Sequence, residues 1–190
     1  MAGSLRGMPL LGERVSLELA NTLFMVRGRP TEGLTRPQQL ADWLRLMGFV
    51  LDDDEVTDDD VARAHRLRDA IRTIAGALVC EDGAGGGADA DPVAVLNEHA
   101  GTPARWHELA LTPQPHVVVR SAGRPVDAAL GAIAADAVDL FGGPDRAQLR
   151  ICGSPSCILY FVGNGRREWC SNRCGNRARA ARHYAKTKQS

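Results

Sequence analysis

"CGSPSCILYFVGNGRREWCSNRC", residues 152–174, contains four of the five cysteines of this 190-residue chain. They follow the spacing C-x4-C-x12-C-x3-C, which is two close pairs separated by a short loop. Tetrahedral zinc takes four ligands at ~2.3 Å from the metal, and two close pairs supply them from a short length of chain. The stretch therefore predicts a structural Zn²⁺ site formed by Cys152, Cys157, Cys170 and Cys174. Because four thiolates leave no coordination position for water, we expect this site to be closed and non-catalytic.

Disulfide bonds are the main alternative for these cysteines, and an iron–sulfur cluster is a second one. Disulfides persist in oxidising compartments, whereas the first residues, "MAGSLRGMPLLGERVSL", lack the charged start and long apolar run of a signal peptide. No stretch approaches the ~20 apolar residues that a membrane span needs. We therefore expect a cytoplasmic protein whose clustered thiols bind metal. Cys80 lies apart from the cluster, and we expect it to be a small buried hydrophobic residue.

Charge is divided unequally along the chain, although the net charge is zero. Residues 150–190 hold nine Lys or Arg and one acid, a net charge of +8, whereas residues 1–149 hold fourteen Arg and twenty-two Asp or Glu, a net charge of −8. This division predicts that the basic part binds a polyanion. The alternative is that the basic tail only solubilises the C-terminus. Arginine dominates the basic part, and guanidinium groups bind phosphate bidentately and reach guanine edges.

The residues after Cys174 favour a basic helix. Alanines are strong helix formers, so "GNRARAARHYAKTK" should place the last two cysteines at the start of a helix. Basic residues three or four positions apart then share neighbouring faces. The candidate nucleic-acid contacts are Arg166, Arg167, Arg173, Arg177, Arg179, Arg182 and Lys186. We interpret Trp169 as packing under the metal site, Tyr184 as either a stacking or a packing residue, and His183 as a surface residue.

Helical patterns dominate the first part of the chain. Apolar residues at helical spacing predict a first helix over residues 15–26. A second helix is predicted over residues 35–48, where Thr35 and Gln38 have the spacing of a capping box and Pro37 fits the first turn.

The longest helix is predicted over residues 57–79, capped by Thr57 with Asp60. Residues 81–91 are rich in glycine and carry no large apolar side chain, so we predict a flexible loop without the features of a phosphate-binding loop. A short helix should follow over residues 92–96.

Strand signals occur only between residues 105 and 120, where two apolar runs flank "PQP" and predict a hairpin or two neighbouring strands. Helical spacing returns over residues 125–141. The chain should therefore have an α+β fold that is mainly helical with a small antiparallel sheet. We predict two domains, residues 1–146 and residues 147–190.

The first domain offers candidate catalytic groups, but none forms a spacing typical of a catalytic set. His65 and Asp69 lie one helical turn apart, as surface pairs do. Asn21 and Thr22 fall within an apolar helix, where they either line a ligand pocket or satisfy a buried hydrogen bond; we favour the hydrogen bond. We predict that the chain is not an enzyme. The other histidines considered are His99, His107 and His116.

The C-terminal motif resembles the CGNR zinc finger, named after residues that stand here as Cys174-Gly175-Asn176-Arg177. The preceding chain resembles the ABATE domain that usually accompanies this finger. The matching stretches are "LELANTL" (17–23), "LTRPQQLADWL" (34–44), "LRDAIR" (67–72) and "GPDRAQLRIC" (143–152). The resemblance implies a bacterial protein, proposed to be a stress-induced transcription regulator, with an α+β domain and a treble-clef-like finger that binds DNA.

Two hypotheses follow for the function. In the first, the finger binds DNA and the N-terminal domain dimerises or senses a small ligand. In the second, the finger is a zinc-dependent module that binds RNA or a protein. One small finger buries too little surface for tight specific binding, so we expect a homodimer or a second contact. The acidic first domain should not readily supply that contact through its own surface charge.

Overall fold

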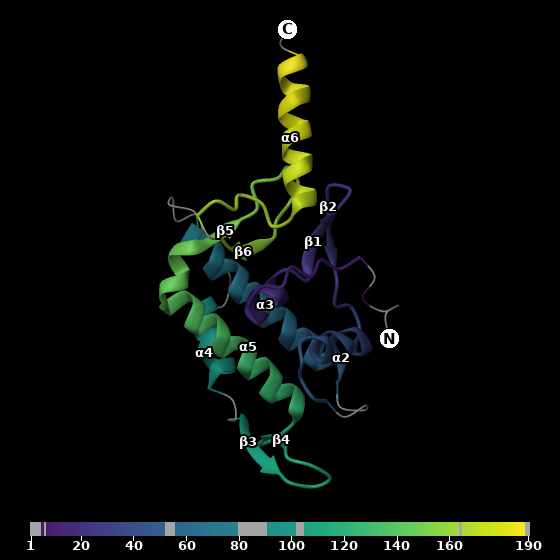
Figure 1. Cartoon of the computed structure of the whole chain (residues 1–190), viewed down its shortest axis with the longest axis vertical. Coiled ribbons are helices and arrows are strands. Elements are labelled where there is room, and N and C mark those ends of the chain that lie inside the picture. The colour runs from purple at the N-terminus through teal and green to yellow at the C-terminus, as the bar shows by residue number, and fades with distance from the viewer. Residues whose placement is uncertain are drawn as a thin grey trace.

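The computed structural model describes residues 5, 7–51, 56–79, 91–101, 105–163 and 165–188. Helices form the middle of the molecule, the C-terminal helix projects from one end, and a β-hairpin lies at the opposite end (Figure 1). Cys80 and nearly all of the predicted loop at 81–91 lie outside the described residues. In the part of the chain that the structure describes, no helix is long and apolar enough to cross a membrane.

The predicted long helix is confirmed as α3 (Asp58–Val79). Its capping box is present: Thr57 N–H donates to Asp60 Oδ2 at 2.9 Å, and Asp60 N–H donates to Thr57 Oγ1 at 3.3 Å. The helix packs against α1 (Val15–Ala20), α4 (Pro92–Ala100) and α5 (Pro125–Gly142). These four helices bury most of one continuous apolar core.

Two helix boundaries differ in detail from the prediction. In α2 (Pro37–Leu46), Pro37 is the first helical residue, so Arg36 becomes the N-cap and Thr35 lies one residue too early for a capping box. Thr35 Oγ1 donates instead to Gln39 Oε1 at 2.7 Å. In α4, the side chain of Asp91 caps the helix by accepting from Val93 N–H, and the helix continues past the predicted end at residue 96 to Ala100.

The predicted helix over residues 15–26 is wrong in its second half. Helix α1 ends at Ala20, and β1 (Leu23–Val26) pairs antiparallel with β2 (Arg29–Glu32). The turn between them is Arg27-Gly28, where both residues have positive φ (51° and 81°), as two-residue hairpin turns of type I′ require. The apolar residues of β1 happen to continue the helical spacing of α1, which explains the error.

The predicted hairpin between residues 105 and 120 is confirmed as β3 (Arg105–Ala110) and β4 (His116–Ser121). Strands occur elsewhere too, because β5 (Leu149–Ile151) pairs with β6 (Tyr160–Val162). The expectation of strands only near 105–120 was therefore wrong: β1, β2, β5 and β6 are too short to show alternation. The predicted class is confirmed as mainly helical α+β with small antiparallel sheets.

The predicted boundary between residues 146 and 147 falls inside η1 (Pro144–Gln148), a short 3-10 helix. The two predicted domains pack on each other, because β5 contacts α3 and β6 contacts α1. The chain then runs into α6 (Asn172–Thr187), which projects away from the other helices (Figure 1).

Candidate metal centre and nucleic-acid interface

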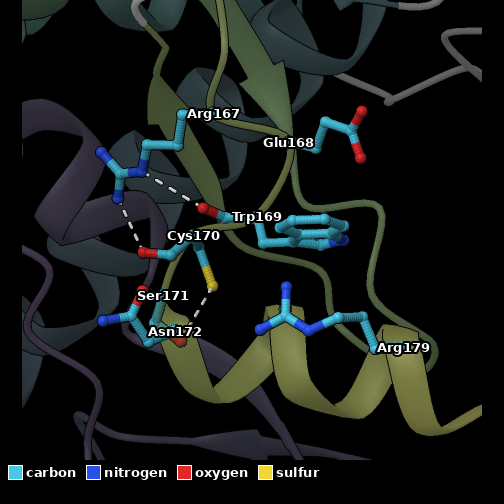
Figure 2. Close-up of a pocket in the computed structure, with 8 residues that line it drawn as sticks. Arg167, Glu168, Trp169, Cys170, Ser171, Asn172 and Arg179 are labelled. Atoms are coloured by element: carbon cyan, nitrogen blue, oxygen red, sulfur yellow. Dashed lines mark hydrogen bonds between the residues drawn. The ribbon is translucent and has the colours of Figure 1, made fainter.

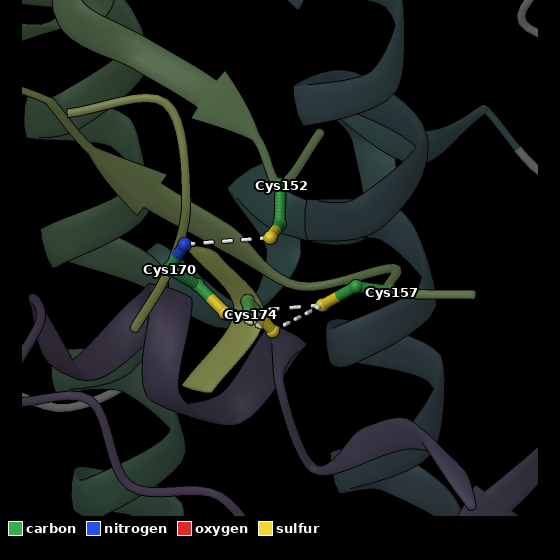
Figure 3. A group of neighbouring side chains, drawn as sticks. All are labelled: Cys152, Cys157, Cys170 and Cys174. Carbon is green, nitrogen blue, oxygen red and sulfur yellow. Dashed lines mark hydrogen bonds between the residues drawn. The ribbon is translucent and has the colours of Figure 1, made fainter. Parts of the chain in front are cut away.

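The four cysteines of the opening stretch come together around one point (Figure 3). Cys152 follows β5, Cys157 precedes β6, and Cys170 and Cys174 lie just before and within the first turn of α6. All four sulfur atoms lie within 4.8 Å of one another. The Sγ–Sγ separations are 3.8 Å for Cys157–Cys170, 3.8 Å for Cys157–Cys174 and 3.5 Å for Cys170–Cys174.

These separations fit a zinc ion and exclude disulfide bonds between the same sulfurs. A tetrahedron with Zn–S bonds of ~2.3 Å has edges of about 3.8 Å, whereas disulfide sulfurs lie at about 2.05 Å. Three of the four side chains are buried and none is in a disulfide. The predicted ligand set is therefore brought together, and it can hold one structural zinc ion with all four positions filled by thiolates.

The electrostatics of the cluster also call for a cation. Hydrogen bonds from the neighbouring thiols, that of Cys157 first, hold the pKa of Cys152 well below its usual range, and the backbone N–H of Cys170 donates to the same sulfur at 3.4 Å. The same thiol contacts and burial raise the pKa of Cys157 and of Cys170. Four thiolates this close repel one another, and a Zn²⁺ ion bound between them would offset that repulsion.

A small apolar cluster surrounds the cysteines. Leu159 and Phe161 from the β5–β6 hairpin pack against the sulfurs, and Phe24 from β1 belongs to the same buried group. The loop between β5 and β6, which carries Cys152 and Cys157, is closed by a hydrogen bond from Cys152 N–H to the carbonyl of Leu159 at 2.9 Å. The β1–β2 hairpin is thus packed on the metal centre.

Asn21 connects the first domain to the finger. Its Nδ2 donates to the carbonyl oxygen of Tyr160 at 2.9 Å, and its Oδ1 accepts from the N–H of Tyr160 at 2.8 Å. The residue is fully buried. The favoured interpretation of Asn21, a buried hydrogen bond rather than a ligand contact, is confirmed. Thr22 also bonds internally, to the carbonyl of Leu19 at 2.8 Å.

Arg167 was predicted to contact nucleic acid, but its contacts lie within the protein. Its guanidinium pairs with Glu13 Oε1 at 2.6 Å and donates to the carbonyls of Trp169 and Cys170 (Figure 2). It also lies over the ring of Phe161, 4.5 Å from the centroid. The other carboxylate oxygen of Glu13 accepts from the N–H of Val162 in β6, so these contacts favour a structural role for Arg167.

Arg167→Ala should therefore destabilise the fold. Removing hydrogen bonds to a charged group is expected to lower the free energy of unfolding by about 1.5–3 kcal/mol, measured by urea denaturation followed by circular dichroism. The matched control is Arg166→Ala, which removes an exposed guanidinium from the adjacent position. That change should stay within about 0.5 kcal/mol of the parent. Equal effects of the two variants would contradict the structural role.

The remaining predicted arginines of α6 are exposed and fall on two sides of the helix. The buried residues Cys174 and Ala178 face the finger. At 3.6 residues per turn, Arg173 and Arg177 lie on one flank of this stripe, and the other flank carries Arg179 and Arg182, whose guanidinium groups lie 5.5 and 5.6 Å from the Trp169 ring centroid.

Figure 2 shows the Arg179 guanidinium beside the Trp169 ring. Trp169 is half-buried and packs against the cysteine cluster, as predicted. The side chain of Lys186 lies outside the described part of the structure. Tyr184 is 71% exposed, with its ring edge-on to that of His183. Of the candidate contacts, Arg173, Arg177, Arg179 and Arg182 thus form the exposed basic surface of α6.

The fold and the site define a mainly helical domain followed by a four-cysteine zinc finger with a basic helix. Residues 13–144 match the ABATE family, described as "Putative stress-induced transcription regulator", and residues 148–187 match the CGNR zinc finger. Because the first match covers well over half of the chain, the chain belongs to the ABATE family. Comparison with curated proteins finds no match.

Proposed function

We propose that this protein is a transcription regulator that binds duplex DNA through α6. The observation that carries the proposal is the placement of this helix: its first turn contributes Cys174 to the cysteine cluster, and the rest projects from the molecule with its arginines exposed (Figure 1). Sixteen residues of helix span about 24 Å. The major groove is about 12 Å wide and admits a single helix.

Charge supports a nucleic-acid partner. Residues 150–190 carry +8, and a zinc ion with four thiolates contributes −2, leaving about +6 on a small module. Arginine is suited to both tasks that α6 would perform, because its planar fork binds phosphates and reaches the O6 and N7 atoms of guanine. Phosphate contacts would position the helix, and base contacts would specify the site.

Arg177→Ala tests this surface. We expect the salt dependence of binding to random-sequence duplex DNA to fall by about 0.9 in log K against log salt, the effect of one lost phosphate contact. Affinity should be measured by fluorescence anisotropy between about 50 and 200 mM salt. The matched control is Arg120→Gln on β4, an exposed arginine at the end of the molecule opposite α6 (Figure 1). Equal slopes for Arg177→Ala and the control would contradict DNA contact through this flank.

The competing function is a module that binds RNA, and the exposed ring of Tyr184 favours it, because single-stranded bases stack on aromatic side chains. The same assay with single-stranded RNA of matched length separates the two. Tighter binding of RNA than of duplex DNA across the salt series would replace the DNA proposal by the RNA one.

We also propose that the first domain is not catalytic. The histidines that are described with their side chains there each place a ring nitrogen near a backbone carbonyl, which supports structural roles. These pairs are His65 with Leu34 at 2.7 Å, His99 with Val95 at 2.9 Å, and His116 with Gln114 at 2.8 Å. Dimerisation or ligand sensing by this domain remains part of the proposal.

A further inference from the structure

A groove of about 690 Å³ lies between the β1–β2 hairpin and the finger. Its lining includes the apolar residues Leu11, Phe24 and Leu159 and three cysteines of the metal centre, Cys157, Cys170 and Cys174. Its cationic lining residues are Arg27 on the hairpin, and Arg173 and Arg177 on α6. Among the described residues that line the groove there is no Asp or Glu, although the first domain as a whole is strongly acidic. The groove therefore favours an anion that extends past its rim.

The tip of the hairpin concentrates positive charge. Residues 26–30 are all exposed and include Arg27 and Arg29. The acid in this hairpin, Glu32, lies at the opposite end, where it pairs with Arg68 and accepts from the N–H of Leu34. The tip is thus a basic point within an acidic domain. From the net negative charge of residues 1–149, we had expected that this domain would not readily supply a second contact to a polyanion.

The turn holds Arg27 in an unusual backbone conformation. Its φ of 51° lies in the left-handed region, which costs residues other than glycine roughly 1–2 kcal/mol and which asparagine tolerates better. The turn directs the chain so that Arg27 reaches the groove and Arg29 starts the returning strand at the tip.

The hairpin is fixed relative to α6. Phe24 in β1 is only 8% exposed and shares one buried cluster with Cys170 and Cys174. The base of the hairpin is tied to α3 through Glu32 and Arg68. The position of Arg27 relative to the arginines of α6 is therefore fixed, as two contacts to one rigid ligand require.

We propose that the β1–β2 hairpin is the second DNA contact: Arg27 and Arg29 bind the phosphate backbone that borders the major groove occupied by α6. One sugar-phosphate strand then passes between Arg27 on one side and Arg173 and Arg177 on the other. This inference rests on the proposed function and adds a partner surface to it. It supplies, within one chain, the additional contact that a single small finger needs.

A polyanion fits this surface better than a small anion does. A small anion needs several donors that converge on one point, whereas here the arginines are exposed and stand on separate elements, the hairpin and α6. A phosphodiester strand presents successive charges and meets such donors one after another. The apolar lining residues would lie against sugars, which carry no charge.

The test uses the full-length, zinc-loaded protein and a random-sequence duplex about two helical turns long. Arg27→Asn and Arg29→Gln are each expected to lower the salt slope by about 0.9 and the affinity roughly five- to tenfold at about 100 mM salt. Arg120→Gln, which removes the same charge at the opposite end of the molecule, should leave both unchanged. Arg27→Asn should melt at the same temperature as the parent or higher, since asparagine suits the turn. Loss of binding would then not reflect unfolding.

Hydroxyl-radical footprinting on a duplex of defined sequence, selected by the parent protein from a random pool, gives a second readout. The parent should protect backbone beside the site of α6, and Arg27→Asn should lose protection at that edge alone. If Arg177→Ala weakens binding but the hairpin variants behave like Arg120→Gln, the hairpin contact is overturned and the proposed function stands. If the parent protein binds no duplex DNA at low salt, the proposed function fails and the hairpin contact fails with it.

Discussion

Cys174→Ser is expected to abolish zinc retention and DNA binding together. Cys174 is 6% exposed, its sulfur lies 3.5–3.8 Å from those of Cys170 and Cys157, and it sits in the first turn of α6. Structural zinc contributes on the order of 10 kcal/mol to the folding of small fingers. The apolar cluster around the cysteines is too small to replace that contribution. Without the fourth thiolate, α6 is no longer attached to the metal centre, and its arginines are no longer held in a fixed arrangement.

Three measurements check this expectation. Metal analysis after dialysis should give one zinc per chain for the parent and close to none for Cys174→Ser. Far-ultraviolet circular dichroism should show a loss of helix no larger than the sixteen residues of α6, because the main apolar core forms a separate cluster. Binding to duplex DNA should fall to the detection limit.

The matched control is Asn172→Ser, which introduces the same side chain at an exposed position in the same helix turn. It should retain zinc and DNA binding. Full zinc content in Cys174→Ser after dialysis would show that the metal is not held by these four thiolates.

Asn21→Ala should cause the largest loss of stability from a single side chain outside the metal centre. The substitution removes both hydrogen bonds between Asn21 and the backbone of Tyr160, and Asn21 is completely buried. Each such loss costs about 1–3 kcal/mol, so the free energy of unfolding should fall by about 2–6 kcal/mol. Urea denaturation monitored by circular dichroism measures it.

Two further variants separate hydrogen bonding from side-chain removal. Asn97→Ala, at an exposed position of α4, should stay within about 0.5 kcal/mol of the parent. Asn21→Asp keeps the shape and the acceptor but places a carboxylate against the carbonyl of Tyr160. It should be at least as destabilising as Asn21→Ala. A change below about 0.5 kcal/mol in Asn21→Ala would contradict the connecting role.

The sequence predicts those features that depend on local spacing. Two cysteine pairs identify the metal centre because the ligands must come from close positions in the chain. Thr57 and Asp60 identify the start of α3 for the same reason, because the two residues of a capping box lie only three positions apart. The β1–β2 hairpin was missed because Leu23 and Val26 fit the helical period. Its available signal was Arg27-Gly28, a dipeptide less typical of hairpin turns than Asn-Gly.

The role of Arg167 could not be predicted from local pattern. Its partner Glu13 is 154 residues away in the chain, and the pairing exists only because β6 packs beside α1. By residue type, Arg167 and Arg173 are equivalent. In the fold, Arg167 makes contacts within the protein, whereas Arg173 lies at the groove. The same applies to Arg27, because the net negative charge of residues 1–149 conceals the basic tip that the hairpin forms in space.

Helix α6 packs against the rest of the protein near its N-terminal end, so a small rotation there becomes a larger displacement at its other end. The helix is seated through Cys174 and Ala178, whereas residues 182–185 are all exposed. Its length is about 24 Å. A rotation of only about 10° at the seated end would therefore carry the free end through about 4 Å, close to one base-pair step of about 3.4 Å. In the proposed DNA complex, a rotation of this size would shift the last turn of α6 by about one base-pair step, and the arginines nearer the seated end by less.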